Sequence, residues 1–332
     1  MVSSKDVAKR AGVSQSTVSR VMNNPSKVSK VARESVIQAM EELNYRPNSV
    51  ARSLVNKKTK SIALISGPLH NPFFVETTTS IVNYAKRHGY HTNVHFENYG
   101  DNMSVYKDVL SHQVDGIILS SIFYDDPIFE ELQKLDIPSM MFNRKHRKGG
   151  HYVEIDNIVA GKMATEHLLE LGHRDIAWIG GGLKTSTFHG RYKGYHDALS
   201  ARGIEVPDHF IQVTDTTAEE IQRALESMLA RKRRPTAIFA ATDSIAIFIL
   251  DYLHEKGYSV PEDISLIGMD NIEWSSHKSF NLTTVGPKSS ENLGQLAIEN
   301  LLDLMELEEI QKEINITIQP ELYIRETTKE LT

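Results

Sequence analysis

The sequence predicts an α/β protein with a small, all-helical N-terminal domain, and three observations lead to this fold class. The first 60 residues carry twelve basic and four acidic side chains, a net charge of +8, whereas the rest carries 25 basic and 39 acidic ones, a net charge of −14. Short helical repeats fill the basic end, and from residue 61 strand-like runs alternate with amphipathic helices. The length of 332 residues suits at least two domains.

Composition excludes several classes of protein. The chain is 40% hydrophobic and 24% charged, as expected of a soluble globular protein. It has no cysteine, which excludes a disulfide scaffold, a thiolate metal site and a cysteine nucleophile, and which suits a reducing cytosol. The N-terminus has charges where a signal peptide needs an apolar stretch, and the longest apolar run, 245–250, is far too short to span a membrane. We therefore expect a cytoplasmic protein with no membrane partner.

Three short helices are predicted within the basic end. Ser3 or Ser4 can cap the first, and Gly12 can end it because glycine adopts a positive φ at little cost. Ser14 can cap a second helix that an Asn-Asn-Pro turn stops, and Ser29 can cap a third. Three helices with about three residues between the first two describe a helix-turn-helix. The alternative is a generic three-helix bundle with one polar face.

The second helix is the candidate DNA-reading element. Its apolar side chains fall on one arc and its polar ones on the other. In a helix-turn-helix the N-terminal residues of this helix meet base edges in the major groove, which suits Gln15 and Ser16, and Arg20 can reach a guanine or a phosphate. We expect these DNA contacts in the helical region: Ser4, Gln15, Ser16, Thr17, Ser19, Arg20 and Asn23.

A very short helix is predicted after the third one. Pro47 breaks the preceding helix, and Asn48 can cap about one and a half turns before a lysine-rich run at 57–60. A helix of this length is marginal in water because nucleation is unfavourable. It needs DNA and a partner helix to form, so the segment is a candidate conformational switch.

The acidic body has the pattern of parallel sheets. Amphipathic helices such as 73–88, 158–171 and 244–256 separate most of its strand-like runs, which implies right-handed crossovers. Open sheets of this kind bind ligands at the carboxyl ends of their strands. The strand-like runs are 61–66, 92–96, 114–120, 137–142, 175–179, 237–241 and 264–268.

Motifs of enzymes and metal sites are missing from the sequence. The glycine-rich stretch at 180–185 fails the phosphate-loop spacing, since Leu183 rather than glycine precedes Lys184. There is no G-x-G-x-x-G after a strand, no H-E-x-x-H and no G-x-S-x-G, and His91 and His95 share a strand face without further ligands. We therefore expect neither an enzyme nor a metal or cofactor.

Two stretches resemble a known family. The sequence D-V-A-K-R-A-G-V-S-Q-S-T-V-S-R-V-M-N-N at 6–24, with N-Y-R-P-N-S-V-A-R-S-L at 44–54, closely resembles the lac/galactose repressor (LacI/GalR) family. The resemblance implies a headpiece at 1–46 and a hinge helix with its linker at 47–60. In such proteins two hinge helices pair in the minor groove and a leucine wedges into the central base step. Leu54 matches that leucine, and Asn48 and Ala51 match its neighbours.

The resemblance continues into the body and implies a two-lobed, periplasmic-binding-protein-like core at 61–332. One lobe would take in about 61–158 and 288–318, and the other about 159–287 and 319–332. An effector would bind between them. The N-P-F-F stretch, with Phe73 and Phe74, resembles the family's aromatic lining of the pocket.

Further effector contacts follow other predicted strands. Arg191 matches the family's effector-contacting arginine, and Asp270 matches a position that accepts hydrogen bonds from ligand hydroxyls. Asp243 either binds the effector or only caps the next helix, while Trp274 either stacks on a sugar or packs at the hinge. The expected set is Phe73, Phe74, Asn143, Arg144, Arg191, Thr242, Asp243, Asp270 and Trp274, with threonine at 242 where the family often has asparagine.

The function that follows is transcriptional regulation. We expect a homodimeric repressor of a pseudopalindromic operator on double-stranded DNA, released by a small effector; a corepressor that strengthens binding is the alternative. A carbohydrate or sugar derivative is favoured over a purine-like effector. No heptads follow the last strand, so a dimer rather than a tetramer is expected. A periplasmic sugar-binding protein would lack the basic headpiece, and a sugar-metabolising enzyme would turn its ligand over.

Overall fold

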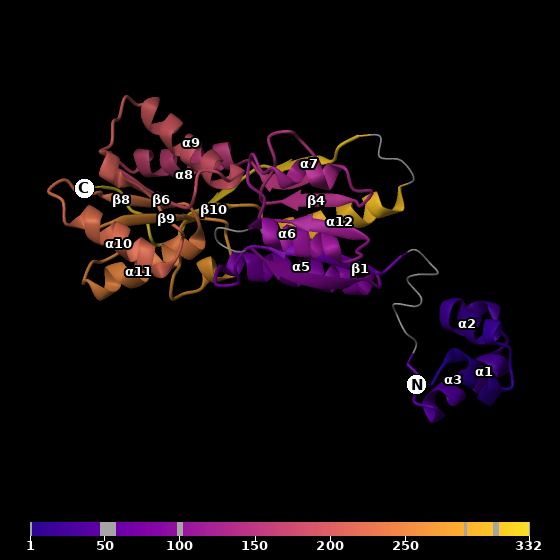
Figure 1. Cartoon of the computed structure of the whole chain (residues 1–332). Helices are drawn as coiled ribbons and strands as arrows, with labels where there is room; N and C mark the ends of the chain where they lie inside the picture. Colours follow the sequence, from indigo (N-terminus) through magenta and orange to yellow (C-terminus); the bar gives the residue numbers. More distant parts are fainter. Residues whose placement is uncertain (1, 47–57, 98–101, 289–290, 308–311, 332) are drawn as a thin grey trace. The chain divides into compact units, whose positions relative to one another are not determined.

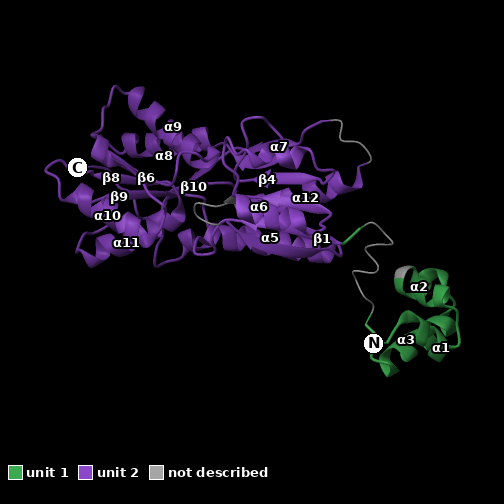
Figure 2. Cartoon of the chain, viewed as in Figure 1, with its two compact units in different colours: residues 1–59 green, residues 60–332 purple. Residues whose placement is uncertain are grey.

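Two compact units, residues 1–59 and 60–332, make up the chain (Figure 2). The computed structural model describes residues 2–46, 58–97, 102–288, 291–307 and 312–331. The boundary between the units lies where the charge of the sequence changes from basic to acidic. The predicted fold class, a helix-turn-helix headpiece followed by two parallel-sheet lobes, is confirmed.

In its described residues, 2–46 and 58–59, the first unit contains three α-helices and a short 3-10 turn. Their bounds are α1 Ser4–Ala11, α2 Gln15–Asn23, η1 Pro25–Lys27 and α3 Lys30–Glu42. Asp6 accepts a hydrogen bond from the Ser3 backbone N–H at 2.9 Å, and Gly12 follows α1 at a φ of 67°. The Ser14 side chain accepts from the Thr17 N–H, as Ser29 does from that of Ala32. The predicted starts of all three helices are therefore confirmed, with Ser3 as the first cap.

A small apolar core holds these helices together. Its six buried side chains within the described part of the unit are all valine or alanine, so little apolar area leaves water. The polar side of α2, which includes Ser16, Ser19 and Arg20, is left exposed. The buried side chains are Val7, Ala8, Val18, Val21, Val36 and Ala39.

The first lobe of the second unit is built on a six-stranded parallel sheet of order β11-β5-β4-β3-β1-β2. Its strands are β1 Ser61–Ser66, β2 His91–Phe96, β3 Gly116–Leu119, β4 Ser139–Phe142, β5 Tyr152–Ile155 and β11 Asn315–Ile318. The helices are α5 Pro72–Arg87, α6 Asn102–Ser111, α7 Ile128–Gln133 and α12 Leu293–Glu306 (Figure 1). Helices α5 and α12 share one apolar core with this sheet, and α6 and α7 share another.

The second lobe repeats the plan, with strand order β12-β10-β9-β8-β6-β7. Only β12 runs antiparallel to its neighbour, β10. Helices α8 and α9 contribute to one core, and α10 and α11 to the other. The strands are β6 Ile176–Gly180, β7 Ile211–Val213, β8 Ala237–Ala240, β9 Ser265–Met269, β10 Thr284–Gly286 and β12 Glu321–Tyr323. The helices are α8 Asn157–Glu170, α9 Ser186–Ser200, η2 Asp208–Phe210, α10 Ala218–Leu229, α11 Asp243–Glu255 and η3 Glu273–Ser276.

The chain passes between the two sheets three times, after β5, after β10 and after β11. Each lobe is consequently assembled from separate stretches of sequence. Strands β5, β7, β10 and β11 were not among the predicted runs, and β12 was expected only as a last strand without bounds. These short strands mix polar and apolar residues over three or four positions, which is too few to show a period, whereas β3, β4 and β8 are equally short but lie in apolar runs. Within the described ranges, no helix has the length and apolar character needed to cross a bilayer.

Candidate ligand cleft and nucleic-acid interface

A cavity lies where the carboxyl ends of strands from both sheets meet, the place at which open α/β sheets bind ligands. The first lobe lines it with segments that follow β1, β2 and β4: Pro68, His70, Asn71, Phe73, Phe74, Glu97, Asn143 and Arg144. The second lobe lines it with α9 and with segments that follow β7, β8 and β9: Thr187, Phe188, Arg191, Thr216, Thr242, Ser244 and Asp270.

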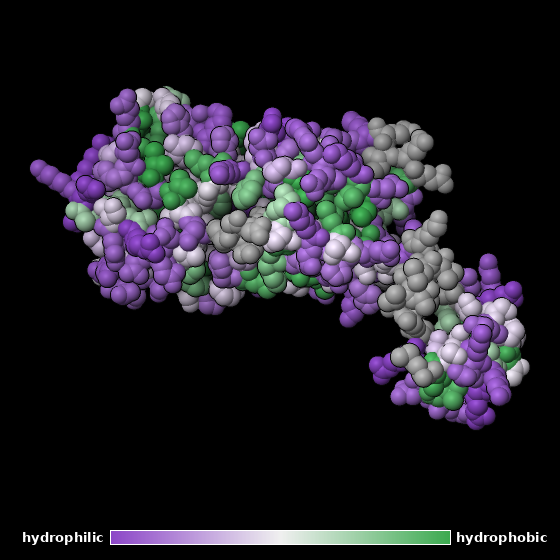
Figure 3. All heavy atoms as spheres, viewed as in Figure 1, coloured by the Kyte–Doolittle hydropathy of each residue, from purple (hydrophilic) through white to green (hydrophobic). Residues whose placement is uncertain are grey.

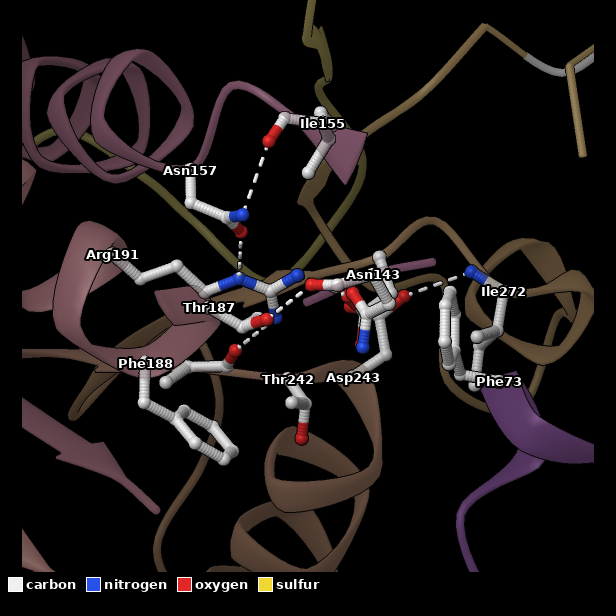
Figure 4. A network of polar contacts seen from close by, with 12 residues as sticks. Phe73, Asn143, Ile155, Asn157, Thr187, Phe188, Arg191, Thr242, Asp243 and Ile272 are labelled. Atoms are coloured by element: carbon white, nitrogen blue, oxygen red, sulfur yellow. Dashed lines mark hydrogen bonds and ion pairs between the residues drawn. The ribbon is translucent and has the colours of Figure 1, made fainter. Parts of the chain in front are cut away.

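Arg191 is the most firmly held side chain of the cavity. A Cβ atom at Gly161 would lie 2.2 Å from the Arg191 carbonyl oxygen, so glycine there allows α8 to approach α9 at this residue. The guanidinium donates from Nε to Asn157 Oδ1 at 3.0 Å and from Nη1 to the carbonyl of Ala241 at 2.5 Å (Figure 4). With the side chain 2% exposed, these bonds fix a buried cation in one orientation.

Asp270 is the partner of that cation. Arg191 Nη2 donates to Asp270 Oδ1 at 2.6 Å, and the aspartate side chain is 5% exposed. Burial raises the pKa of the Asp270 carboxyl, and the charge of Arg191 opposes that rise. The residue follows β9 at a φ of 117°, a conformation that non-glycine residues rarely adopt and that neighbouring structure must hold.

A second ion pair faces the cavity from the first lobe. Arg144 Nη1 lies 3.2 Å from Glu97 Oε2, and the two side chains are 9% and 12% exposed. Beside them Asn143 has a φ of 62°, and its buried Oδ1 has no hydrogen-bond partner among the described residues. Each wall thus carries one carboxylate and one guanidinium, and Asn143 offers an open acceptor.

Aromatic side chains complete the lining. Phe73 and Phe74 meet edge to face with ring centroids 5.3 Å apart, and Phe188 lies on the opposite lobe. A Cβ at Gly67 would come within 2.3 Å of the Phe74 ring, so only glycine lets that ring lie against the end of β1. The cavity therefore combines ring faces with charged and polar groups.

The two lobes touch around the cavity. The Tyr124 N–H donates to the Lys184 carbonyl at 2.8 Å, and the Lys145 N–H donates to Ser186 Oγ at 2.9 Å. The Thr187 hydroxyl also donates to the Asn143 carbonyl. The enclosed volume of about 50 Å³ is well below the roughly 300 Å³ at which small-molecule sites begin. A ligand of that class can enter only if the lobes part or side chains move.

A larger chamber of about 1050 Å³ adjoins the cavity. The two share Glu97, Arg144, Phe188 and Thr216. The chamber offers a route between the cavity and solvent.

Two of the predicted effector residues lie elsewhere. Asp243 is fully buried and accepts from Thr284 Oγ1 at 2.6 Å and from the Ile272 N–H at 3.0 Å, and burial raises the pKa of its carboxyl. It does not cap α11 either, since Thr242 accepts from the Ile245 N–H there. The prediction of a cap was wrong because the aspartate turns into its own lobe. Trp274, 54% exposed in η3, does not line the cavity.

The cavity also contains residues that the sequence reasoning missed. Glu97, Thr216 and Ser244 line it. Asn157, which is not part of the lining, holds Arg191 from the start of α8. Glu97 directly follows β2, so the rule that found Asn143 would have found it if every strand end had been searched. No group of three or more histidine, aspartate or glutamate side chains in the described ranges could hold a metal ion.

The start of α2 carries a set of polar contacts of its own. Gln15 Nε2 donates to Ser4 Oγ at 2.9 Å, and Ser14 Oγ lies 2.8 Å from Ser16 Oγ and 2.9 Å from Thr17 Oγ1. The described residues include the backbone of Asn23, the last residue of α2, but not its side chain. The predicted hinge residues Asn48, Ala51 and Leu54 lie outside the described residues.

Two family models match the chain. One describes bacterial regulatory proteins of the lacI family and matches residues 4–48. The other describes a periplasmic binding protein-like domain and matches residues 165–328. The matched segments contain α2 and most of the second lobe.

Relatives match over the whole length. The HTH-type transcriptional repressor PurR of Glaesserella parasuis is 33% identical, over 100% of this chain and 99% of its own. The protein of the same name from Serratia proteamaculans is 35% identical, over 98% of this chain and 96% of its own. Among solved structures, the lac repressor dimer bound to operator and the anti-inducer ONPF superposes with a TM-score of 0.85 at 29% identity, covering 99% of each chain. The complex of the transcriptional regulator CelR with cellobiose superposes with a TM-score of 0.72 at 29% identity, covering 98% of this chain and 100% of that one.

Proposed function

The chain belongs to the lacI family of bacterial regulatory proteins and is a DNA-binding transcriptional repressor, and on this premise we propose that a small, uncharged, sugar-like effector releases it from a pseudopalindromic operator. The observation that carries the choice of effector is the pair of buried carboxylate–guanidinium contacts, one on each wall of the cavity.

A polyhydroxylated ligand suits these groups. Carboxylates accept hydrogen bonds from hydroxyls and guanidinium groups donate to them, so one ring can satisfy both walls at once. The two acidic and two basic groups balance, which favours a ligand without net charge. Asn143 Oδ1 accepts no hydrogen bond among the described residues, and a ligand hydroxyl could donate one to it. The phenylalanine rings supply apolar faces for the C–H side of a sugar.

A purine-like corepressor is the second candidate. It is favoured by the name PurR that the full-length relatives bear. The same phenylalanines would stack on a flat base, and Asp270 would accept from a ring N–H. The sign of the response separates the two candidates, because a corepressor strengthens operator binding and an inducer weakens it.

The repressor would act as a homodimer. Leu69, Val75, Phe96 and Trp274 are large apolar side chains with 43% to 54% of their surface exposed. Glu76 accepts from the Glu273 N–H at 2.9 Å, so α5 and η3 lie together and Val75 is near Trp274. Phe96 ends β2, the edge strand of its sheet, and apolar patches interrupt the polar surface of the core (Figure 3). A second copy would cover such surface, and two headpieces suit two half-sites.

The lobes would couple the effector to DNA. A ligand that needs more room than the closed cavity favours a different separation of the lobes. Separated hinge helices at about 47–60 would then lose their partners and melt. Because coupling between two sites is reciprocal, operator DNA must weaken an inducer's binding by the same factor. Such a protein acts in the cytoplasm, where its operator is.

The first experiment is selection of duplex DNA by the purified protein. We expect an enriched palindrome with a C-G centre, and an affinity that falls steeply with salt as phosphate contacts are screened. Leu54→Ala should weaken binding to that site while leaving binding to random DNA nearly unchanged. If Leu54→Ala weakens binding to the selected site and to random DNA equally, Leu54 does not wedge into the duplex. If no sequence is enriched, either with or without metabolite pools, the proposal of a specific operator is refuted.

The second experiment titrates neutral sugars and purine bases against the protein–operator complex. A change in the separation of the lobes should alter the emission of Trp274, because η3 contacts α5 of the other lobe, whereas Trp178 is fully buried within its own lobe. We expect a neutral sugar to lower operator affinity and to change this emission. A purine that raises operator affinity would replace the sugar with the corepressor.

A further inference from the structure

We propose that Ser4 and Gln15 act together as a reader of one adenine in each operator half-site, with Ser4 as the positioning residue. The proposal rests on the operator binding proposed above and adds the identity of a base and the group that selects it. Its starting observation is the 2.9 Å contact from Gln15 Nε2 to Ser4 Oγ, which links the first residues of α1 and α2.

Gln15 is the long polar side chain free to reach a base at the start of α2. The neighbouring hydroxyls are already engaged: Ser14 Oγ accepts from the Thr17 N–H at 3.1 Å and lies 2.8 Å from Ser16 Oγ. Ser16 is also too short to span far beyond the helix surface. The exposed amide of Gln15 uses one N–H on Ser4, which leaves its second N–H and its oxygen for DNA.

The chemistry of the DNA backbone fixes the direction of this contact. A serine hydroxyl can donate or accept, so by itself Ser4 permits either orientation of the Gln15 amide. A phosphate oxygen only accepts. If Ser4 donates its single proton to a phosphate, its lone pairs face Gln15, and the amide must turn its NH₂ group towards Ser4.

The orientation of the amide then selects the base. The remaining N–H and the Oε1 atom form a donor next to an acceptor. Adenine presents the complementary pair in the major groove, the N7 acceptor and the N6 amino donor, whereas guanine presents two acceptors. A chain of hydrogen bonds from phosphate through Ser4 and Gln15 to the base thus favours adenine over guanine.

Selection of duplex DNA with four variants of the full chain tests the proposal. The base pair read by Gln15 is the one whose preference Gln15→Ala erases. The wild type should prefer adenine there by roughly tenfold or more. Gln15→Glu, which offers only acceptors, should shift the preference to cytosine through its N4 amino group.

Ser4 is tested by the ratio of adenine to guanine at that same base pair. Ser4→Ala should bring the ratio close to one, because the amide is then free to turn over. Ser4→Thr keeps the hydroxyl and should keep the ratio, which a loss of helix stability alone would not explain. Guanine preferred by the wild type, an unchanged ratio in Ser4→Ala, or no base pair that depends on Gln15 would overturn the proposal. If no sequence is enriched at all, the proposed operator binding is refuted, and the proposal for Ser4 and Gln15 is refuted with it.

Discussion

Among the described residues, the first unit folds around six buried side chains no larger than valine, whereas each face of the two core sheets buries a dozen or more apolar side chains. The burial of the candidate binding residues differs between the two units as well. Gln15, Ser16 and Arg20 of the headpiece are exposed, but Arg191 and Asp270 of the core are at most 5% exposed. The headpiece is also basic and the core acidic.

The size and charge of the ligands proposed for the two units account for this difference. DNA is long and brings many phosphates, so a small unit with exposed donors and little apolar area can bind it tightly. The small uncharged effector proposed for the cavity would make few contacts, so the groups that meet it have to be buried and fixed beforehand. That rigidity requires the larger core around them.

Among the changes that test this comparison, removing Arg191 should cause the largest loss of stability and of effector response. Arg191→Ala leaves Asp270 buried without its cation, which should lower the free energy of unfolding of the core by about 3–5 kcal/mol and abolish the effector response. Operator affinity in the folded protein should not change. Denaturant unfolding and operator titrations with effector measure both effects.

A matched control for that experiment is Arg191→Lys, which keeps the charge but loses the fork that holds Asn157, Ala241 and Asp270. Compared with Arg191→Ala, Arg191→Lys should recover part of the free energy of unfolding but not the effector response. If Arg191→Ala unfolds like the wild type, or if the effector still changes its operator affinity, Arg191 does not have the role proposed for it in the cavity.

Deleting apolar volume should affect the two units unequally. Val36 and Val153 are both fully buried, one in the headpiece and the other in the core. Each change to alanine should lower the free energy of unfolding by about 2 kcal/mol. Because a unit of this size is only marginally stable, Val36→Ala should reduce operator affinity strongly while Val153→Ala leaves it nearly intact. Similar operator affinities in the two variants would contradict a marginal headpiece.

Mild acidification should lower the stability of the core and not that of the headpiece. All 14 histidines lie beyond residue 60, and burial lowers the pKa of His173, which is 2% exposed and bonded to Thr236 and Ser265. A pKa lowered in the folded state means that stability is present above the unfolded value of 6.5 and is lost as pH falls through the folded pKa. The melting temperature of the core should therefore fall as the pH drops below 6.5, while the headpiece, which has no histidine, should not lose stability through this cause.

The variant His173→Gln isolates this group. Buried carboxyls whose pKa is raised, such as Asp270 and Glu154, act in the opposite direction and are the same in both proteins. The variant should lose less stability on acidification than the wild type. Parallel pH profiles would show that His173 is not responsible.

The smallest effect is expected at an exposed ion pair of the headpiece. Arg10 and Glu42 lie 2.5 Å apart but are 59% and 35% exposed, so solvent screens them. Glu42→Gln should change the free energy of unfolding by less than about 1 kcal/mol. Thermal melts at low and high salt measure it, and a loss comparable to that of Val36→Ala would show that surface charge, not the small core, holds the headpiece together.

Local features of this protein could be predicted from the sequence. The serine caps at positions 3, 14 and 29 and the glycine at position 12 act within one helical turn, so their effect does not depend on distant residues. The strands that lie in apolar or alternating runs were predicted within two residues at each end, even where, as in β3, β4 and β8, the strand has only four residues. The short strands of mixed polar and apolar residues carry too little periodic signal for this, and the predicted hinge helix lies outside the described residues.

The sequence by itself therefore determined the two-unit plan, the helix-turn-helix with its candidate DNA-reading helix, and the strand ends at which a ligand site can form, because these depend on composition, period and the family motif. Only the tertiary structure decided which strand-end residues meet. Asp243 and Asp270 both follow strands, yet Thr284 draws the first into its lobe at 2.6 Å, while Arg191 holds the second in the cavity. Glu97 and Arg144 pair across 47 residues of sequence. Such pairings depend on where the sheet brings distant segments together, and no local pattern records that.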